Sequence, residues 1–203
     1  MGSHASLAID GAGNPHISYL DSTNSDLKFA KYNGVSWSTQ TVDSAGSVGE
    51  FNSVAVDGAG NAHISYYDFT NANLKYAKYN GASWSVQAVD SDGDVGFYSS
   101  IALDGAGNPN ISYQSTTNFD LKYARYNGVS WSTQTVDSAG TVGYYTSFAI
   151  DGSGNPQMVY RETTNWDLKF AKWTGAGLTA PMGGNSRVKA QARVFRIQPP
   201  RLT

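Results

Sequence analysis

The chain has 203 residues, 40% of them hydrophobic and 15% charged, and it contains 13 Tyr, 8 Phe and 5 Trp. That apolar content is higher than disordered chains carry, and no apolar run approaches the roughly 20 residues that cross a bilayer. We therefore expect a globular protein with no membrane partner. The sequence has no cysteine, which excludes disulfides, thiolate metal sites and thiol catalysis.

Charge is divided unevenly along the chain. Residues 1 to 176 hold nine Lys or Arg and all sixteen Asp and Glu, a net charge of −7, and five later basic residues return the total to −2. Phosphate neutralisation by basic residues supplies most of the affinity that proteins have for nucleic acid. The acidic body therefore predicts no nucleic-acid partner.

The dominant feature of the sequence is a gapless repeat of 47 residues, seen at Asp10, Asp57, Asp104 and Asp151. The copies cover residues 6–52, 53–99, 100–146 and 147–193. Self-similarity at such a period indicates an array or a propeller, because one unit of this length cannot bury its own apolar faces.

Each copy has the pattern of four short strands joined by polar turns. In the first copy we expect strands at residues 6–10, 16–20, 27–32 and 37–42. Gly and Asn residues predict a tight turn at 11–15, and Asn33-Gly34 predicts a hairpin turn. Residues 21–26 form a polar loop, and residues 43–52 lead to the next copy. No segment has a convincing helical period.

We predict an all-β fold, a β-propeller of four-stranded antiparallel blades with four repeats per chain. A β-solenoid is the main competitor, but Asn-Gly hairpins turn a chain back rather than advance it along an axis. Four blades could close alone as a ring, or two chains could complete one eight-bladed ring, which leaves a homodimer open.

The second copy reads Ala55-Val-Asp57, then Asn61-Ala-His-Ile-Ser-Tyr-Tyr-Asp68, Leu74-Lys-Tyr-Ala77 and Gly81-Ala-Ser-Trp84. It resembles bacterial and archaeal β-propeller repeats with blades of the form ALDxxGNPHISYYD…LKYA…GxxW. The resemblance implies a blade without implying a chemistry, and it suggests a secreted or cell-surface origin. Blade length is also similar to that of tachylectin-type propeller lectins, but the lectin motifs are not matched.

The fourth copy loses the pattern after Lys172, and Leu178 stands where Trp is expected. Alternation at residues 186–197 is enough for one strand, which could replace the outer strand of the last blade. An unrelated, read-through or engineered extension is the alternative. We divide the chain into an added leader, three complete blades, an incomplete blade and a divergent extension, at residues 1–5, 6–52, 53–99, 100–146, 147–176 and 177–203.

Differences between the copies indicate a candidate ligand-binding face. They concentrate in the loop between the second and third strands and in the connection between blades, which lie at one end of an antiparallel blade. The candidate residues are Phe97, Tyr98, Phe119, Tyr144, Tyr145, Trp166, Tyr67 and Arg161. Aromatic rings stack on sugars or pack against protein partners. We expect the inter-blade pairs to wedge between neighbouring blades, and Phe119 and Trp166 to serve binding.

Two features suggest a metal site and are better explained by structure. His16, His63, Asn110 and Gln157 occupy one repeat position, but amides are poor ligands for transition metals. The run Asp90-Ser-Asp92-Gly-Asp94 lacks the glutamate of an EF-hand loop, and Asp10 to Asn14 indicates an Asp-capped turn. We expect no metal and no cofactor.

Hydrolase, phosphate-binding and dinucleotide-binding motifs are missing from the sequence. Only Glu50 and Glu162 lie outside the repeated Asp positions, and nothing pairs them as catalytic carboxylates. We therefore expect no enzyme, and a β-propeller module that binds carbohydrate or protein through one loop face. The alternatives are a fragment or engineered repeat assembly that only self-associates and, less favoured, a glycan-active hydrolase.

Overall fold

A computed structural model describes residues 2–173 and 178–179. These residues form strands and turns without a helix, and none belongs to a helix able to cross a membrane. The strands are β1 (Gly2–Ile9), β2 (Pro15–Asp21), β3 (Asp26–Tyr32), β4 (Trp37–Asp43), β5 (Val48–Val56), β6 (Ala62–Asp68), β7 (Asn73–Tyr79), β8 (Trp84–Asp90), β9 (Val95–Leu103), β10 (Pro109–Ser115), β11 (Asp120–Tyr126), β12 (Trp131–Asp137), β13 (Tyr144–Ile150), β14 (Pro156–Arg161), β15 (Leu168–Trp173) and β16 (Leu178–Thr179).

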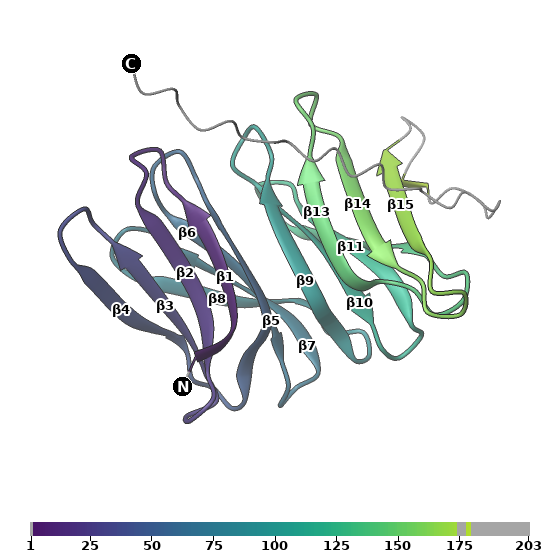
Figure 1. Cartoon of the computed structure of the whole chain (residues 1–203), viewed down its shortest axis with the longest axis horizontal. Helices are drawn as coiled ribbons and strands as arrows, with labels where there is room; N and C mark the ends of the chain where they lie inside the picture. The colour runs from purple at the N-terminus through teal and green to yellow at the C-terminus, as the bar shows by residue number, and fades with distance from the viewer. Residues whose placement is uncertain (1, 174–177, 180–203) are drawn as a thin grey trace, which may run out of the picture.

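The strands form four antiparallel sheets, each in sequence order, which we call blades 1 to 4: β1–β4, β5–β8, β9–β12 and β13–β16. The first strand of each blade packs beside the first strand of the next, so that β1, β5, β9 and β13 form the inner row. Blades 1 and 4 lie at opposite ends of an open arc (Figure 1). The predicted all-β propeller of four-stranded blades is confirmed.

The first strand of a blade begins earlier than the repeat boundaries suggest. Val48 to Asn52, expected in the connection, belong to β5, and Gly2 to Ala5, expected in a leader, belong to β1. A bulge in each inner strand makes this extension, with φ of 49° at both His4 and Phe51. The boundary between two copies therefore falls inside a strand.

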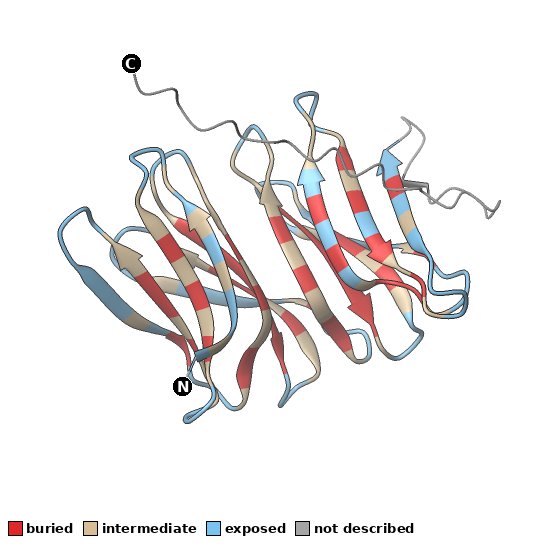
Figure 2. Ribbon diagram, viewed as in Figure 1, coloured by how far each residue is buried: buried red, intermediate tan, exposed pale blue. Residues whose placement is uncertain are grey.

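The hydrophobic core lies between the blades rather than within them (Figure 2). Each sheet has a leading face, which meets the preceding blade, and a trailing face, which meets the following blade. Leu27 and Phe29 on the trailing face of blade 1 pack with Val54, Ile64 and Tyr66 on the leading face of blade 2. The two other junctions contain equivalent clusters. One blade alone therefore cannot bury its apolar residues.

A buried carboxylate fastens each junction. Asp43, at the end of β4, accepts a hydrogen bond from the Tyr66 hydroxyl at 2.7 Å and pairs with Lys75 Nζ at 2.5 Å. Burial opposes ionisation of Asp43, but the bonds from Lys75 and Tyr66 outweigh it and hold its pKa below the ordinary value. Asp90 and Asp137 bind the next blade in the same way.

In blade 4, Leu178 and Thr179 pair with β15 as the start of a fourth strand. The alternating segment at 186–197, proposed as that strand, lies outside the described residues.

Candidate binding pockets between blades

A pocket of about 370 Å³ opens between blades 3 and 4. It lies at the end of the blades where the two repeated turns are found. Its lining comes from the first turn and the second to fourth strands of blade 3, and from the first turn, β14 and β15 of blade 4: Asp104, Asn110, Tyr123, Arg125, Ser132, Thr133, Gln134, Gly154, Asn155, Pro156 and Trp173.

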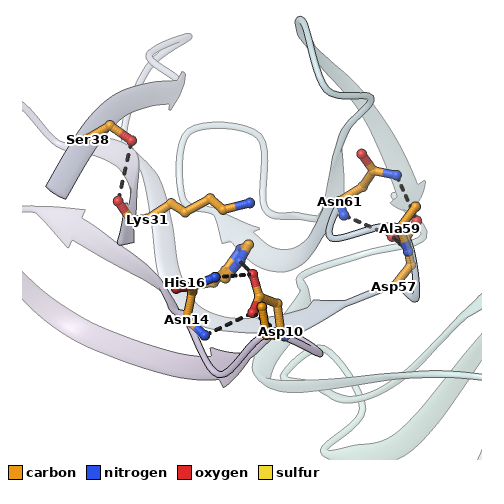
Figure 3. Close-up of polar contacts among 9 residues, drawn as sticks. Asp10, Asn14, His16, Lys31, Ser38, Asp57, Ala59 and Asn61 are labelled. Atoms are coloured by element: carbon orange, nitrogen blue, oxygen red, sulfur yellow. Dashed lines mark hydrogen bonds and ion pairs between the residues drawn. The ribbon is translucent and has the colours of Figure 1, made fainter. Parts of the chain in front are cut away.

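A second pocket, of about 210 Å³, lies one repeat earlier, between blades 2 and 3. Its lining residues are the repeat equivalents of those in the larger pocket: Tyr76, Lys78, Ser85, Gln87, Gly107, Asn108, Pro109 and Tyr126. The corresponding region between blades 1 and 2 has Lys31 and Ser38 on one side and the Asp57 to Asn61 turn on the other (Figure 3). The junction between blades 1 and 2 thus places equivalent residues where the other two junctions have a pocket.

A rigid turn of the following blade forms one rim of each pocket. Asp57 Oδ1 accepts hydrogen bonds from the backbone N–H groups of Ala59 and Asn61, and its Oδ2 accepts one from the Asn61 amide (Figure 3). Burial opposes ionisation of Asp57, but these bonds and one from His63 hold its pKa below the ordinary value. The predicted Asp-capped turn is confirmed, and it fixes the position of the pocket rim.

The back wall consists of a buried polar side chain and an aromatic ring. In blade 2, His63 Nδ1 lies 2.6 Å from the Tyr76 hydroxyl. At the equivalent place in blade 3, the Tyr123 hydroxyl donates a hydrogen bond to Asn110. Burial raises the pKa of Tyr123 to about 12, so this hydroxyl stays protonated. In blade 1 the ring is Phe29, and His16 Nδ1 is buried without a hydrogen-bond partner among the described residues.

A basic side chain projects from the third strand toward each pocket. Lys78 and Arg125 line the two pockets, and Lys31 has the same repeat position in blade 1. A Cβ atom added at Gly60 would lie 3.9 Å from Lys31 Nζ, so the ammonium reaches the turn of blade 2. Within the part of the chain that the structure describes, none of the three basic groups has an ion pair, in contrast to Lys75 and Lys122 on the same strands. Each pocket therefore has a cation available to a ligand.

The outer strands differ in sequence between the junctions. Between blades 1 and 2, the Trp84 indole donates to Gln40 Oε1 at 2.7 Å and covers the outer strand. Blade 4 has Leu178 where blade 2 has Trp84. Gln134, the equivalent of Gln40, lines the larger pocket together with Trp173.

The sequence-predicted binding residues lie at the opposite end of the blades. Four of them pack as a row along the inner strands, with ring centroids 6.3 Å apart for Phe97 and Tyr98, 5.5 Å for Tyr98 and Tyr144, and 4.6 Å for Tyr98 and Tyr145. The row joins blades 3 and 4, and Phe51 extends it into blade 2 at 4.7 Å from Tyr98. Tyr145 is nevertheless 63% exposed, so the expected wedging of these rings between blades stays a prediction.

The remaining predicted residues divide into buried and exposed groups. Tyr67 is 3% exposed, and its hydroxyl donates to Asp94. Phe119 and Trp166 are 44% and 74% exposed, each with a positive φ in its loop. The Arg161 guanidinium lies 4.0 Å from the centre of the Trp166 ring. The structure thus brings Trp166 and Arg161 together, while Phe119 lies in the equivalent loop of blade 3.

The two suspected metal-binding features have structural partners. His16 and His63 each face the Asp of their own turn at 3.2 and 3.4 Å. Asp90 and Asp94 are engaged by tyrosines, Tyr113 and Tyr67, that lie on different strands. Glu162 caps its own loop by accepting the Asn165 N–H. No group of three metal-ligating side chains occurs in residues 2–173 and 178–179.

Sequence reasoning missed the pocket residues Lys78, Arg125, Gln134 and Trp173. One signal was present: the third strand has two basic positions, of which only the first is needed to fasten a blade junction. The second, at Lys31, Lys78, Arg125 and Lys172, is basic in all four copies. A position that stays basic in every copy fits a role in the architecture, but a repeated binding site keeps its residues in the same way.

No protein-family model matches the chain, and no curated protein matches it. Solved structures do match. The SapL1 lectin in complex with α-methyl fucoside aligns with a TM-score of 0.62 at 16% identity, over 89% of this chain and 62% of that chain. A lectin of Aleuria aurantia, bound to a fucose-α1,6-GlcNAc disaccharide, aligns with a TM-score of 0.57 at 16% identity, over 90% and 62%.

An ulvan lyase, described as a polysaccharide lyase, aligns with a TM-score of 0.58 at 14% identity, over 87% of this chain and 56% of that chain. The chain therefore spans about three fifths of the length of the lectins and just over half of the lyase. At these identities the likeness shows a shared propeller fold. Membership of the repeat family named above stays a prediction, as does the origin of the protein.

Proposed function

We propose that the protein is a non-enzymatic carbohydrate-binding module that holds sugar units in the pockets between its blades. The observation that carries the proposal is the recurrence of one arrangement at successive junctions: an aromatic ring, a basic side chain and fixed amide and hydroxyl groups. Sugar recognition uses these groups, since a ring face packs on the apolar face of a pyranose while fixed polar groups bind its hydroxyls. Lectins and a glycan-active lyase share the fold.

The basic residue in each pocket favours an acidic sugar, such as a uronate or a sulfated unit. Arg125 presents a planar fork of donors that can bind a carboxylate or a sulfate with two hydrogen bonds. Among the described residues, Asp104 is the one acid that lines the larger pocket, and it is bound by its own turn. Arg125 forms no ion pair with a described carboxylate, so its donors can meet a ligand anion.

The same lining supports a binding role over a hydrolytic one. Glycoside hydrolysis generally needs two carboxyl groups across the scissile bond. Asp104 is the single carboxyl group that the described residues contribute to the larger pocket. Hydrogen bonds from Asn108 outweigh the effect of burial and hold the pKa of Asp104 below the ordinary value. A carboxylate kept ionised in this way is a poor proton donor.

Binding should be screened on an array of neutral, uronate-containing and sulfated glycans, followed by titration of the best ligand. We expect Arg125→Gln to weaken binding about tenfold or more, because it removes a charged hydrogen bond. Lys28→Gln is the control, since Lys28 pairs with Asp26 of its own blade at 3.4 Å and lines neither pocket. Equal losses in both variants, or no binding of any glycan, would refute the proposal.

The exposed loop face is a second candidate site for the same class of ligand. Trp166 is 74% exposed, and Arg161 stacks on one side of its ring, which leaves the other side open. If this face binds the ligand, Phe119→Ala combined with Trp166→Ala abolishes binding while Arg125→Gln leaves it unchanged. The two sites therefore predict opposite results in the same titration.

A further inference from the structure

The leading face of blade 1 is apolar and open. Leu7 is 61% exposed and Trp37 is 52% exposed. The residues at the place of Leu7 in the following blades, Val54, Ile101 and Phe148, are 7%, 7% and 8% exposed. Blade 1 thus presents to solvent the side chains that every other blade buries against its predecessor.

The trailing face of blade 4 also exposes apolar side chains that the other blades bury. Leu168 is 57% exposed, whereas its equivalents Leu27, Leu74 and Leu121 are fully buried. Phe170 is 37% exposed, against 4% for Phe29 at the same place in blade 1. The two ends of the arc are therefore the two halves of a blade junction.

At two repeat positions, the residues of the open ends differ from those of the internal junctions in a way that makes the two faces complementary. In every internal junction a trailing-face serine binds a polar side chain of the next blade, in the pairs Ser18 with Asn52, Ser65 with Ser99 and Ser112 with Thr146. The corresponding residues at the open ends are Val159 on blade 4 and Ala5 on blade 1. A junction between the ends therefore replaces a polar pair with an apolar pair, and it leaves no buried hydroxyl without a partner.

We propose that blade 4 of one chain docks on blade 1 of a second copy of this chain, head to tail, through these two faces. Continuity with the three internal junctions supports this occupant, because a second copy supplies the face that each open end lacks. Two copies that make both contacts form a closed dimer, since a head-to-tail contact closes only when its rotation returns to the start. The inference is independent of the proposed function.

The new junction is expected to be weaker than the internal ones. Each internal junction has an aspartate that bonds to the next blade: Asp43, Asp90 or Asp137. The residue at this repeat position in the fourth copy is Gly184, which has no carboxylate. Lys28, the blade 1 equivalent of Lys75, pairs with Asp26 of its own blade at 3.4 Å. The contact therefore rests on apolar packing, and we expect association that depends on protein concentration.

Sedimentation of the full chain over a range of concentrations tests the proposal. We expect a mass of two chains for the wild type, and of one chain for both Leu7→Glu and Phe170→Glu. A mixture of the two variants should regain association, because each keeps the face that the other has lost. Val35→Glu, in an exposed turn, is the control and should associate as the wild type does. Thermal unfolding checks that every variant is folded.

A cross-link provides an independent check, since the chain has no cysteine. Ala5→Cys combined with Val159→Cys should give disulfide-linked dimers on oxidation, whereas either substitution alone should give far fewer. Ser65→Cys combined with Ser99→Cys, at a pair whose hydroxyls lie 2.8 Å apart, should cross-link within one chain. A wild type that remains a single chain, a mixture that fails to associate, or association that survives either glutamate variant overturns the proposal.

Discussion

On the trailing side of blades 1 and 2, one residue decides whether a buried histidine has a hydrogen-bond partner. His63 Nδ1 bonds to the Tyr76 hydroxyl, but the equivalent Phe29 leaves His16 Nδ1 unsatisfied. The two rings lie in the same setting, since Phe29 packs against Trp84 at 5.1 Å and Tyr76 against Trp131 at 5.3 Å. A tyrosine hydroxyl should therefore fit in blade 1.

We predict that Phe29→Tyr raises the free energy of unfolding by about 1 kcal/mol, because it satisfies a buried polar atom. The reverse change, Tyr76→Phe, should cost about 1 to 3 kcal/mol by leaving His63 without its partner. Urea denaturation of both variants measures the difference. Destabilisation by Phe29→Tyr would show that His16 does not need this hydrogen bond.

The same histidines make stability depend on pH. Burial lowers the pKa of His16 and of His63 below 6.5, and the hydrogen bond to Asp10 or Asp57 opposes burial only in part. The unfolded chain therefore binds more protons than the folded chain as pH falls through 6.5, so stability is lost toward acid pH.

We predict a slope of at most about 1.4 kcal/mol per pH unit for each histidine on the acid side of its unfolded pKa. His63→Asn should reduce this slope with little change at pH 8, because Asn110 already occupies the position in blade 3. Denaturation at several pH values tests this, and an unchanged slope in the variant would assign the dependence to other groups.

At the scale of the strand, the aspartate contacts distinguish an interior blade from a terminal one. Lys75 reaches Asp43 of the preceding blade, whereas Lys28 has the same place in blade 1 and pairs only with Asp26 among the described carboxylates. We predict that Lys75→Met lowers the free energy of unfolding by about 2 to 3 kcal/mol, because it leaves a buried carboxylate short of its cation. Lys28→Met should change stability by less than about 1 kcal/mol. Equal effects in chemical denaturation would contradict this account.

How far the sequence predicts the molecule differs between elements. Asn-Gly turns and alternating strands are local signals, so the four-stranded blades could be predicted from one copy. The start of β5 at Val48 could not, because the bulge at Phe51 has no local signature and depends on the adjacent blades. The pockets were missed for a related reason: Arg125 and Asn155 meet only across a blade junction, 30 positions apart in sequence.

At the scale of the whole molecule, the repeat couples the architecture to the proposed binding. Each junction that buries an apolar core between two blades also forms a pocket at the end with the repeated turns. A chain of such blades therefore offers several equivalent sites along its arc. A polymer of repeating sugar units would gain avidity by occupying more than one site, with no new contact in any of them.

The most direct test of the account is a crystal structure of the protein with the best ligand from the glycan screen. The account predicts an acidic sugar unit between blades 3 and 4, with its charged group at Arg125 and its ring against Trp173. A sugar that binds only at Phe119 and Trp166, at the opposite end of the blades, would contradict it.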